Sequence, residues 1–234
     1  RDRLRSRGLG DVYKRQIIVM PYLMVKLGAE GYGYVGFSLS VVQYLIIIVD
    51  FGFNLSATKR IAVVAGDRIA LSRVFWNVVA AKLLLMFLTT LALLVLVVCI
   101  PTFRLYGNAI IATYPMSLGS ALTFMWFFQG VGRIRLFSIM NTVSKLVLLP
   151  LIFVFVQTPD DYVMAALLQA VVFVSTAIIS NIYIARKHLV AWVRPTWLLV
   201  KEELHVSFPL FLSSASTSVY TPVSYTHLTL PTIA

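Results

Sequence analysis

Long apolar runs alternate along this chain with short connections, and every second connection is rich in Lys and Arg. The runs recur from Ile17 to Tyr220, at lengths near the roughly 20 residues that an α-helix needs to cross a bilayer. A soluble fold has no reason to alternate basic with charge-poor connections, whereas a membrane-spanning chain retains Lys and Arg on the cytoplasmic side. The pattern therefore predicts an all-α, multi-pass membrane protein.

The composition supports this prediction. Hydrophobic residues make up 59% of the chain, charged residues make up 12%, and the mean hydropathy is +0.88. Soluble domains are about 45–50% apolar and about 25% charged. The net charge of +11 lies mostly in the connections, and the chain carries no aromatic–basic motif of a nucleic-acid-binding module. We expect no nucleic-acid partner.

We expect a six-helix transmembrane bundle followed by the start of a seventh helix. The six runs are residues 17–27, 34–53, 75–100, 109–128, 136–156 and 163–185, and the seventh begins near Ser207. A short amphipathic stretch after the second run is expected to lie on the membrane surface. A basic connection, residues 186–206, leads from the sixth run to the seventh.

The charges of the connections predict the orientation of the chain. The connections after the second, fourth and sixth runs hold four, two and four Lys or Arg residues, ten in all. Those after the other three runs hold only two, Lys26 and Arg104. The excess of cations places the N-terminus and the basic connections in the cytoplasm, and the acidic connection at Asp160 and Asp161 on the other side.

The two ends of the chain differ from its body. Residues 1–16 and 223–234 resemble translated stretches that recur at the ends of reading frames assembled from environmental DNA. The first apolar run, residues 17–27, is also about half as long as a bilayer requires. We therefore expect an internal fragment with a truncated first helix and non-native ends, and we exclude both ends from functional reasoning.

Two lysines lie inside apolar runs, where an ammonium costs at least ~2.5–3.5 kcal/mol unless it meets water, a partner or an anion. Lys145 lies near the middle of the fifth run, too deep to reach the headgroups easily. We expect it to line a cavity that attracts a negatively charged substrate. Lys82, in the third run, either lines the same cavity or extends toward the cytoplasmic headgroups.

Other polar residues share helix faces with these candidates. Asn141 falls on the same face as Lys145, and Gln43 on the same face as Asp50. A similar stripe on the sixth run includes Gln169, although small polar residues also serve as ordinary packing contacts between membrane helices. We assign Asn141 and Gln43 to the substrate path. Asp50 could carry a coupling proton, pair with Lys82, or cap the turn after it.

The motifs of catalysis and of cofactor binding are missing. The chain has no P-loop, no His or Cys spacing of a metal site, no Ser/His/Asp grouping and no acidic pair on a basic connection. We expect no catalytic residue, no metal and no cofactor. A passive or ion-coupled transporter fits these absences better than an enzyme does.

Three stretches together resemble a known family. Residues 21–62 contain LGAEGYGYVG and DFGFNLSATKRIA, residues 126–162 begin with WFFQG, and residues 205–213 read HVSFPLFLS. These patterns are similar to those of the polysaccharide biosynthesis (Wzx-type) flippases for O-antigen and other lipid-linked oligosaccharides. These flippases belong to the multidrug/oligosaccharidyl-lipid/polysaccharide exporter superfamily.

The resemblance implies two six-helix lobes that form a V around a cationic cavity. It implies alternating-access transfer of an undecaprenyl-pyrophosphate-linked oligosaccharide across the bacterial inner membrane. The expected partners are membrane lipids, a polysaccharide polymerase and other envelope assembly proteins. This chain would hold the first lobe (residues 17–185), the cytoplasmic connection (186–206) and the start of helix 7 (207–222). The cationic cavity would fall at Lys145 and Lys82.

Two alternatives remain open. One is another exporter of the same superfamily, either a peptidoglycan-precursor flippase or a drug/cation antiporter. A cation exporter should favour carboxylates in its cavity, whereas here the lysines outnumber Asp50. The other is a membrane-embedded glycosyl- or acyltransferase, which would need an acid/base cluster on a connection longer than those present.

Overall fold

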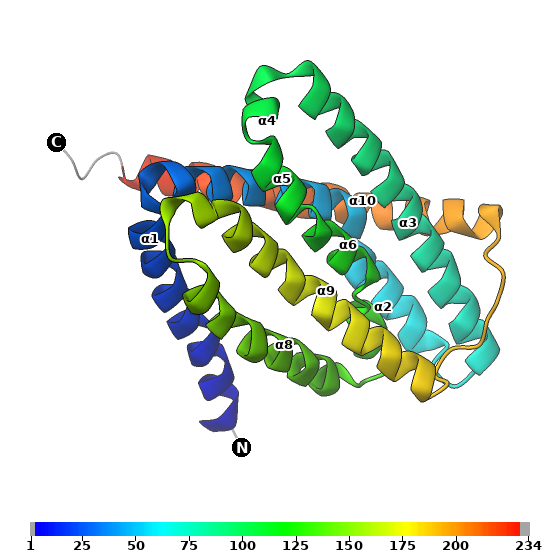
Figure 1. Ribbon diagram of the computed structural model, residues 1–234. Helices are drawn as coiled ribbons and strands as arrows, with labels where there is room; N and C mark the ends of the chain where they lie inside the picture. Colours follow the sequence, from blue (N-terminus) through cyan, green and yellow to red (C-terminus); the bar gives the residue numbers. More distant parts are fainter. Residues whose placement is uncertain (1–2, 230–234) are drawn as a thin grey trace.

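The computed structural model describes the backbone of residues 3–229 and the side chains of residues 19–217. Helices make up most of this part of the chain, which contains no β-strand, so the predicted all-α class is confirmed (Figure 1). In chain order the elements are α1 (Arg3–Asp50), α2 (Phe53–Val63), α3 (Arg68–Cys99), α4 (Pro101–Leu105), α5 (Gly107–Thr113), α6 (Pro115–Leu122), α7 (Met125–Gly130), α8 (Ile134–Phe155), the 3₁₀ turn η1 (Pro159–Asp161), α9 (Tyr162–Arg186) and α10 (Trp197–Thr229).

Five helical segments of the described chain are long and apolar enough to cross a membrane. They are Val19–Val63, Arg68–Cys99, Gly107–Gly130, Ile134–Phe155 and Pro159–Arg186. Their outer faces are apolar: on α3 the side chains of Phe87, Leu94 and Val98 are more than half exposed. A helix facing water would carry polar residues at such positions, so these faces support contact with lipid.

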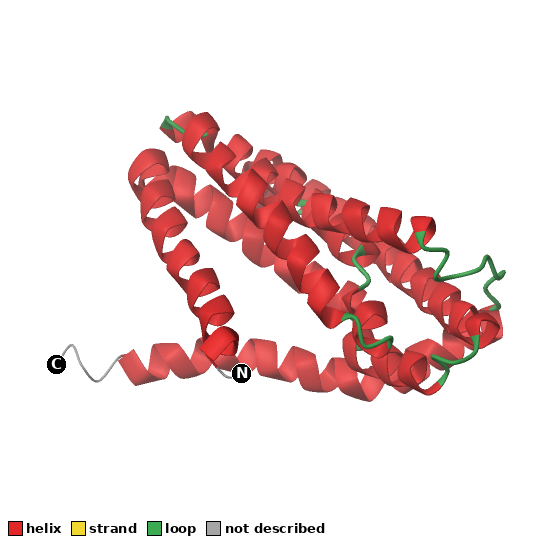
Figure 2. Cartoon of the chain, turned by 90° about the horizontal axis from the view of Figure 1, so that it is seen from below, coloured by secondary structure: helices red, strands yellow, loops and turns green. Residues whose placement is uncertain are grey.

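The first of these segments contains two helical arms, because α1 bends sharply at Gly28. The backbone of Gly28 has φ 67° and ψ −179°, a conformation that is essentially restricted to glycine. The turn expected between the first two runs is therefore a break at a single residue. Helical backbone continues from it to Arg3 in one direction and to Asp50 in the other. Figures 1 and 2 show the two arms leaving the bend in different directions.

The fourth run is not the continuous helix expected for residues 109–128. It is divided into α5, α6 and α7. Pro115 lacks the N–H that would continue the helix from α5. Thr123 has an extended backbone (φ −88°, ψ 118°) that separates α6 from α7. Together the three short helices still cover the candidate span Gly107–Gly130.

The seventh helix begins earlier than expected. α10 starts at Trp197 rather than near Ser207, so the non-helical connection is confined to residues 187–196. This connection is held against α3 by hydrogen bonds. Trp76 Nε1 donates to the carbonyl oxygen of Ala191 over 2.9 Å, and Ala191 N donates to Ser72 Oγ over 2.8 Å.

The amphipathic stretch after the second run forms α2, which is packed into the bundle. Phe53, Ala57 and Ile61 on one face are fully buried, whereas Lys59 and Val63 on another face are exposed. The buried face joins an aromatic core that surrounds Phe75 and Trp126. The amphipathic pattern was therefore predicted correctly, but its apolar face contacts protein.

The connections gather at two ends of the bundle. At one end, which we call the basic end (residues 59–73, 133–135 and 186–201), Arg133 Nη1 lies 3.5 Å from the Tyr183 hydroxyl. At the other, the tyrosine end, the ring of Tyr34 lies 5.0 Å from those of Tyr106 and Tyr162. All three cation-rich connections thus lie at one end, as the alternation of charge requires.

Candidate functional site

A cavity of about 430 Å³ opens between the two arms of α1, α8 and α9. The bend at Gly28 produces it, because Val19 and Leu23 from the first arm and Val35 from the second line the same space. Most of the wall is apolar. The polar side chains that line it are Tyr32, Gln43, Thr142, Lys145 and Gln169.

Among the described residues that line this cavity, Lys145 is the charged one. Its side chain is partly buried on α8, and within the described residues no hydrogen bond or ion pair satisfies it. An unpaired ammonium in a membrane-spanning segment is costly unless water or an anion meets it. The cavity can therefore accept one negatively charged group, with the amides of Gln43 and Gln169 as additional hydrogen-bond donors.

Two polar residues near Lys145 differ in their placement. Gln43 lines the cavity as predicted, but Asn141 is not among its lining residues. Thr142, one residue further along α8, lines it instead. The sequence analysis missed Thr142, although its spacing of three residues before Lys145 places both on one helix face and could have identified it.

Lys82 and Asp50 form a separate, buried ion pair. Lys82 Nζ lies 2.9 Å from Asp50 Oδ1 and donates to the carbonyl oxygen of Ser120 over 3.3 Å. The Lys82 side chain is 2% exposed and that of Asp50 is 26% exposed. Lys82 therefore neither lines the cavity nor extends toward the headgroups in this structure. Of the roles open to Asp50, the structure shows the pairing with Lys82, which ties α1, α3 and α6 together.

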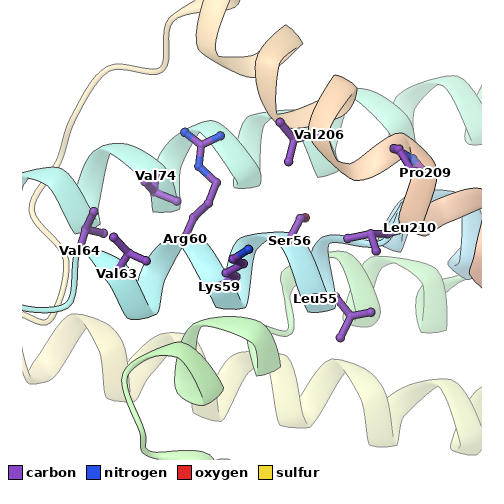
Figure 3. A pocket seen from close by; sticks show the side chains of 10 residues that line it. All are labelled: Leu55, Ser56, Lys59, Arg60, Val63, Val64, Val74, Val206, Pro209 and Leu210. Atoms are coloured by element: carbon purple, nitrogen blue, oxygen red, sulfur yellow. The ribbon is translucent and has the colours of Figure 1, made fainter.

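A second set of polar contacts joins α2 to α10 at the basic end. Ser56 Oγ lies 2.7 Å from Ser207 Oγ, and Arg60 Nη1 lies 3.1 Å from Glu203 Oε1. The spacing is four residues on both helices, which run antiparallel. Figure 3 shows Ser56 and Arg60 on the side of α2 that faces the α10 residues. We call these contacts, together with the approach of Gly52 to Leu210, the α2–α10 ladder.

Gly52 allows the two helices to come together at the last step of the ladder. Its φ is 77°, and a Cβ there would lie 2.8 Å from Leu210 Cβ and 2.9 Å from Phe211 N. Any side chain at this position would push α10 away. The sequence analysis missed the ladder because its residues lie in segments judged only by their charge. The four-residue spacing of Gly52, Ser56 and Arg60 was the available signal.

A groove of about 690 Å³ lies beside the ladder (Figure 3). Lys59 and Arg60 are the cations of its wall, which is otherwise mostly apolar. Arg60 is already paired with Glu203 and, at 3.4 Å, with Glu202. Arg60 is therefore engaged in ion pairs, and Lys59 is the cation of the described groove wall that has none.

Glu203 is the buried acid of the ladder. Its side chain is 1% exposed, and its Oε2 atom has no hydrogen-bond partner among the described residues. Burial raises the pKa of this carboxyl from 4.5 to about 7, although Arg60 lowers it. Glu203 lies outside the five candidate spans, at the basic end.

Stability should therefore fall as pH rises through 7. Between pH 4.5 and 7 the folded protein holds a proton on Glu203 that the unfolded chain has released, so raising the pH disfavours the folded form. From pH 6 to pH 8 we expect a loss of about 1 kcal/mol, measured as a lower Tm of the purified full-length protein. Glu203→Gln should remove this dependence, and the control Glu202→Gln, at a position 52% exposed, should retain it. An identical pH dependence in Glu203→Gln would contradict the assignment.

Comparisons with known proteins give matches over almost the whole chain. The family described as "Polysaccharide biosynthesis protein" matches residues 9–230. A protein of Escherichia coli (strain K12) named "Putative O-antigen transporter" is 28% identical over 211 residues, which cover 90% of this chain and 51% of that protein. A protein of Shigella dysenteriae with the same name is 33% identical over 215 residues, which cover 91% and 53%. The chain spans about half the length of these curated relatives. No solved structure gives a significant match.

Proposed function

Because the chain belongs to the polysaccharide biosynthesis protein family, we propose that it forms the first half of a flippase for lipid-linked oligosaccharides in the bacterial inner membrane. The ammonium of Lys145, which lines the cavity and has no hydrogen-bond or ion-pair partner among the described residues, carries this proposal. The names of the two curated relatives support O-antigen units as the substrate class.

The proposed substrate combines an undecaprenyl tail, a pyrophosphate and a short polar oligosaccharide. The tail can stay in lipid, but the pyrophosphate and the sugars need a polar path through the hydrocarbon. Lys145 supplies a charge-assisted hydrogen bond to the pyrophosphate. Gln43, Thr142 and Gln169 supply neutral hydrogen bonds from the same wall. No bond of the substrate is made or broken in this process.

In this proposal the first lobe has six membrane-spanning helices. They are the first arm of α1, the second arm of α1, α3, the combined α5–α7, α8 and α9. The connection 187–196 leads to α10, the first helix of a second lobe that completes the other wall of the cavity. The basic end faces the cytoplasm, and the tyrosine end faces the periplasm, in line with the distribution of Lys and Arg. The N-terminus then lies in the cytoplasm, and interaction with a polysaccharide polymerase remains a prediction.

The α2–α10 ladder provides a cytoplasmic closure for alternating access. It joins the first lobe to the helix that leads into the second, and it does so at the basic end. A substrate arriving from the cytoplasmic leaflet requires the lobes to separate at that end. The ladder then represents the closed state of the cytoplasmic entrance, and its few polar contacts must break for loading.

Export of surface polysaccharide should depend on the charge of Lys145. Lys145→Ala in the full-length gene should reduce export at least tenfold in a host that lacks its own flippase, because a hydrogen bond to a charged group contributes about 1.5–3 kcal/mol. Lys145→Arg should retain most of the export. The control Arg104→Ala removes an exposed cation outside the cavity and should have little effect. Normal export by Lys145→Ala at equal membrane abundance would remove Lys145 from the path.

The charge of the cavity also separates this proposal from a drug/cation antiporter. Lys145 lines the cavity, and no Asp or Glu is among the described residues of its wall. A cation would be repelled by Lys145 and would find no counter-charge there. A peptidoglycan precursor also carries a pyrophosphate, so a flippase for that substrate remains the second candidate. Export assays with each substrate separate the two.

A further inference from the structure

Large apolar side chains are exposed where the connection enters α10. Trp192 is 72% exposed, Trp197 is 59% exposed and Leu198 is 74% exposed. They lie outside the five candidate spans found among the described residues. Trp is enriched where membrane meets water, because its ring is apolar and its N–H is polar.

Cations flank these apolar side chains along the sequence. Residues 186–201 include Arg186, Lys187, Arg194 and Lys201 and no Asp or Glu, so this segment carries four positive charges. All four side chains are exposed. Lys201 Nζ lies 5.6 Å from the centre of the Trp197 ring, which brings charge and aromatic surface together.

The connection has a defined position against the bundle. Besides the two hydrogen bonds that Ala191 makes with Trp76 and Ser72, Thr196 N donates to Asn77 Oδ1 over 3.0 Å. The rings of Trp76 and Trp192 meet edge to face at 4.4 Å between centroids. These contacts fix the connection beside the start of α3, at the basic end.

We propose that Trp192, Arg194, Trp197, Leu198 and Lys201 form a surface that binds anionic glycerophospholipids of the leaflet at the basic end. We call it the tryptophan–arginine surface. The two Trp rings and Leu198 enter the boundary between headgroups and acyl chains, while Arg194 and Lys201 contact lipid phosphates. Charge complementarity and continuity with the ends of the spans favour lipid over a soluble protein. This proposal depends on membrane insertion and not on the flippase function.

Lipid contact can be measured with a probe at position 198. Full-length protein carrying Leu198→Cys, with Cys99→Ser and any other cysteine replaced, is labelled with an environment-sensitive fluorophore in nanodiscs. Spin-labelled phosphatidylglycerol should quench the probe more strongly than spin-labelled phosphatidylcholine does, and aqueous iodide should quench it weakly. Gly66→Cys, on an exposed turn, serves as the matched control position.

The charge contribution is tested by Arg194→Gln combined with Lys201→Gln. Each cation near an anionic membrane surface adds to the free energy of lipid binding. Losing both should therefore reduce the preference for phosphatidylglycerol by roughly tenfold or more. Quenching by iodide equal to that at Gly66→Cys would overturn the proposal, because the surface would then face water. Protection from both iodide and lipid quenchers would also overturn it, because protein would then cover the surface. A preference unchanged in the double variant would refute the role of the two cations.

Discussion

A disulfide between Ser56→Cys and Ser207→Cys should stop the transport of lipid-linked oligosaccharide, and reduction should restore it. The two Oγ atoms lie 2.7 Å apart, so sulfur atoms at these positions need little movement to bond at about 2.05 Å. The bond would hold α2 against α10 and keep the cytoplasmic entrance closed. The measurement uses full-length protein in proteoliposomes, with Cys99 and any other cysteine replaced, before and after addition of oxidant and reductant.

A second pair of hydroxyls provides a matched control inside the proposed first lobe. Thr113 Oγ1 donates to Ser38 Oγ over 3.0 Å, and both side chains are fully buried. A disulfide between Ser38→Cys and Thr113→Cys joins α1 to α5, which move together in this proposal, so transport should continue. Complete cross-linking of positions 56 and 207 without loss of transport would show that the α2–α10 ladder does not open. That result would leave the role of Lys145 intact.

Asp50→Asn should strongly destabilise the protein, because it leaves the Lys82 ammonium buried without a counter-charge. Loss of one partner of a buried ion pair costs on the order of 3 kcal/mol, which should appear as a lower Tm and a lower yield of folded full-length protein. Lys82→Met should cost less, because the side chain of Asp50 is 26% exposed and can still reach water. Equal stability of wild type and Asp50→Asn would contradict the structural role of the pair.

The double variant Asp50→Asn/Lys82→Met separates structure from ion coupling. It removes both charges, so most of the lost stability should return. If the pair only joins α1, α3 and α6, the double variant should also transport. A folded double variant that does not transport would instead assign to Asp50 the coupling role that its sequence position allowed.

The cavity shows how much of its lining can be predicted from residue spacing in the sequence alone. Lys145 and Gln43 were selected because a charge or an amide is costly in an apolar helix unless it faces a polar space, and both line the cavity. Asn141 satisfied the same rule but does not line it. Helix periodicity locates a face only to within about one residue, and Thr142 occupies the position beside Lys145 instead.

Residue spacing alone could not predict the Lys82–Asp50 ion pair or the α2–α10 ladder. Lys82 and Asp50 are 32 positions apart along the chain, and Arg60 and Glu203 are 143 apart. Each residue alone is compatible with several roles. Only the packing of α1 against α3, and of α2 against α10, brings Lys82 to Asp50 and Arg60 to Glu202 and Glu203.

The sequence alone determined the class of this protein, the positions of its apolar runs and the grouping of its cations. These properties depend on local composition, on helix length relative to bilayer thickness, and on the cost of placing charge in lipid. The tertiary structure decided which charges are neutralised and which remain free, because that depends on distances between helices that are remote in sequence. Among the described residues Lys82 has an ion-pair partner and Lys145 has none, although the two lysines lie in similar apolar surroundings along the chain.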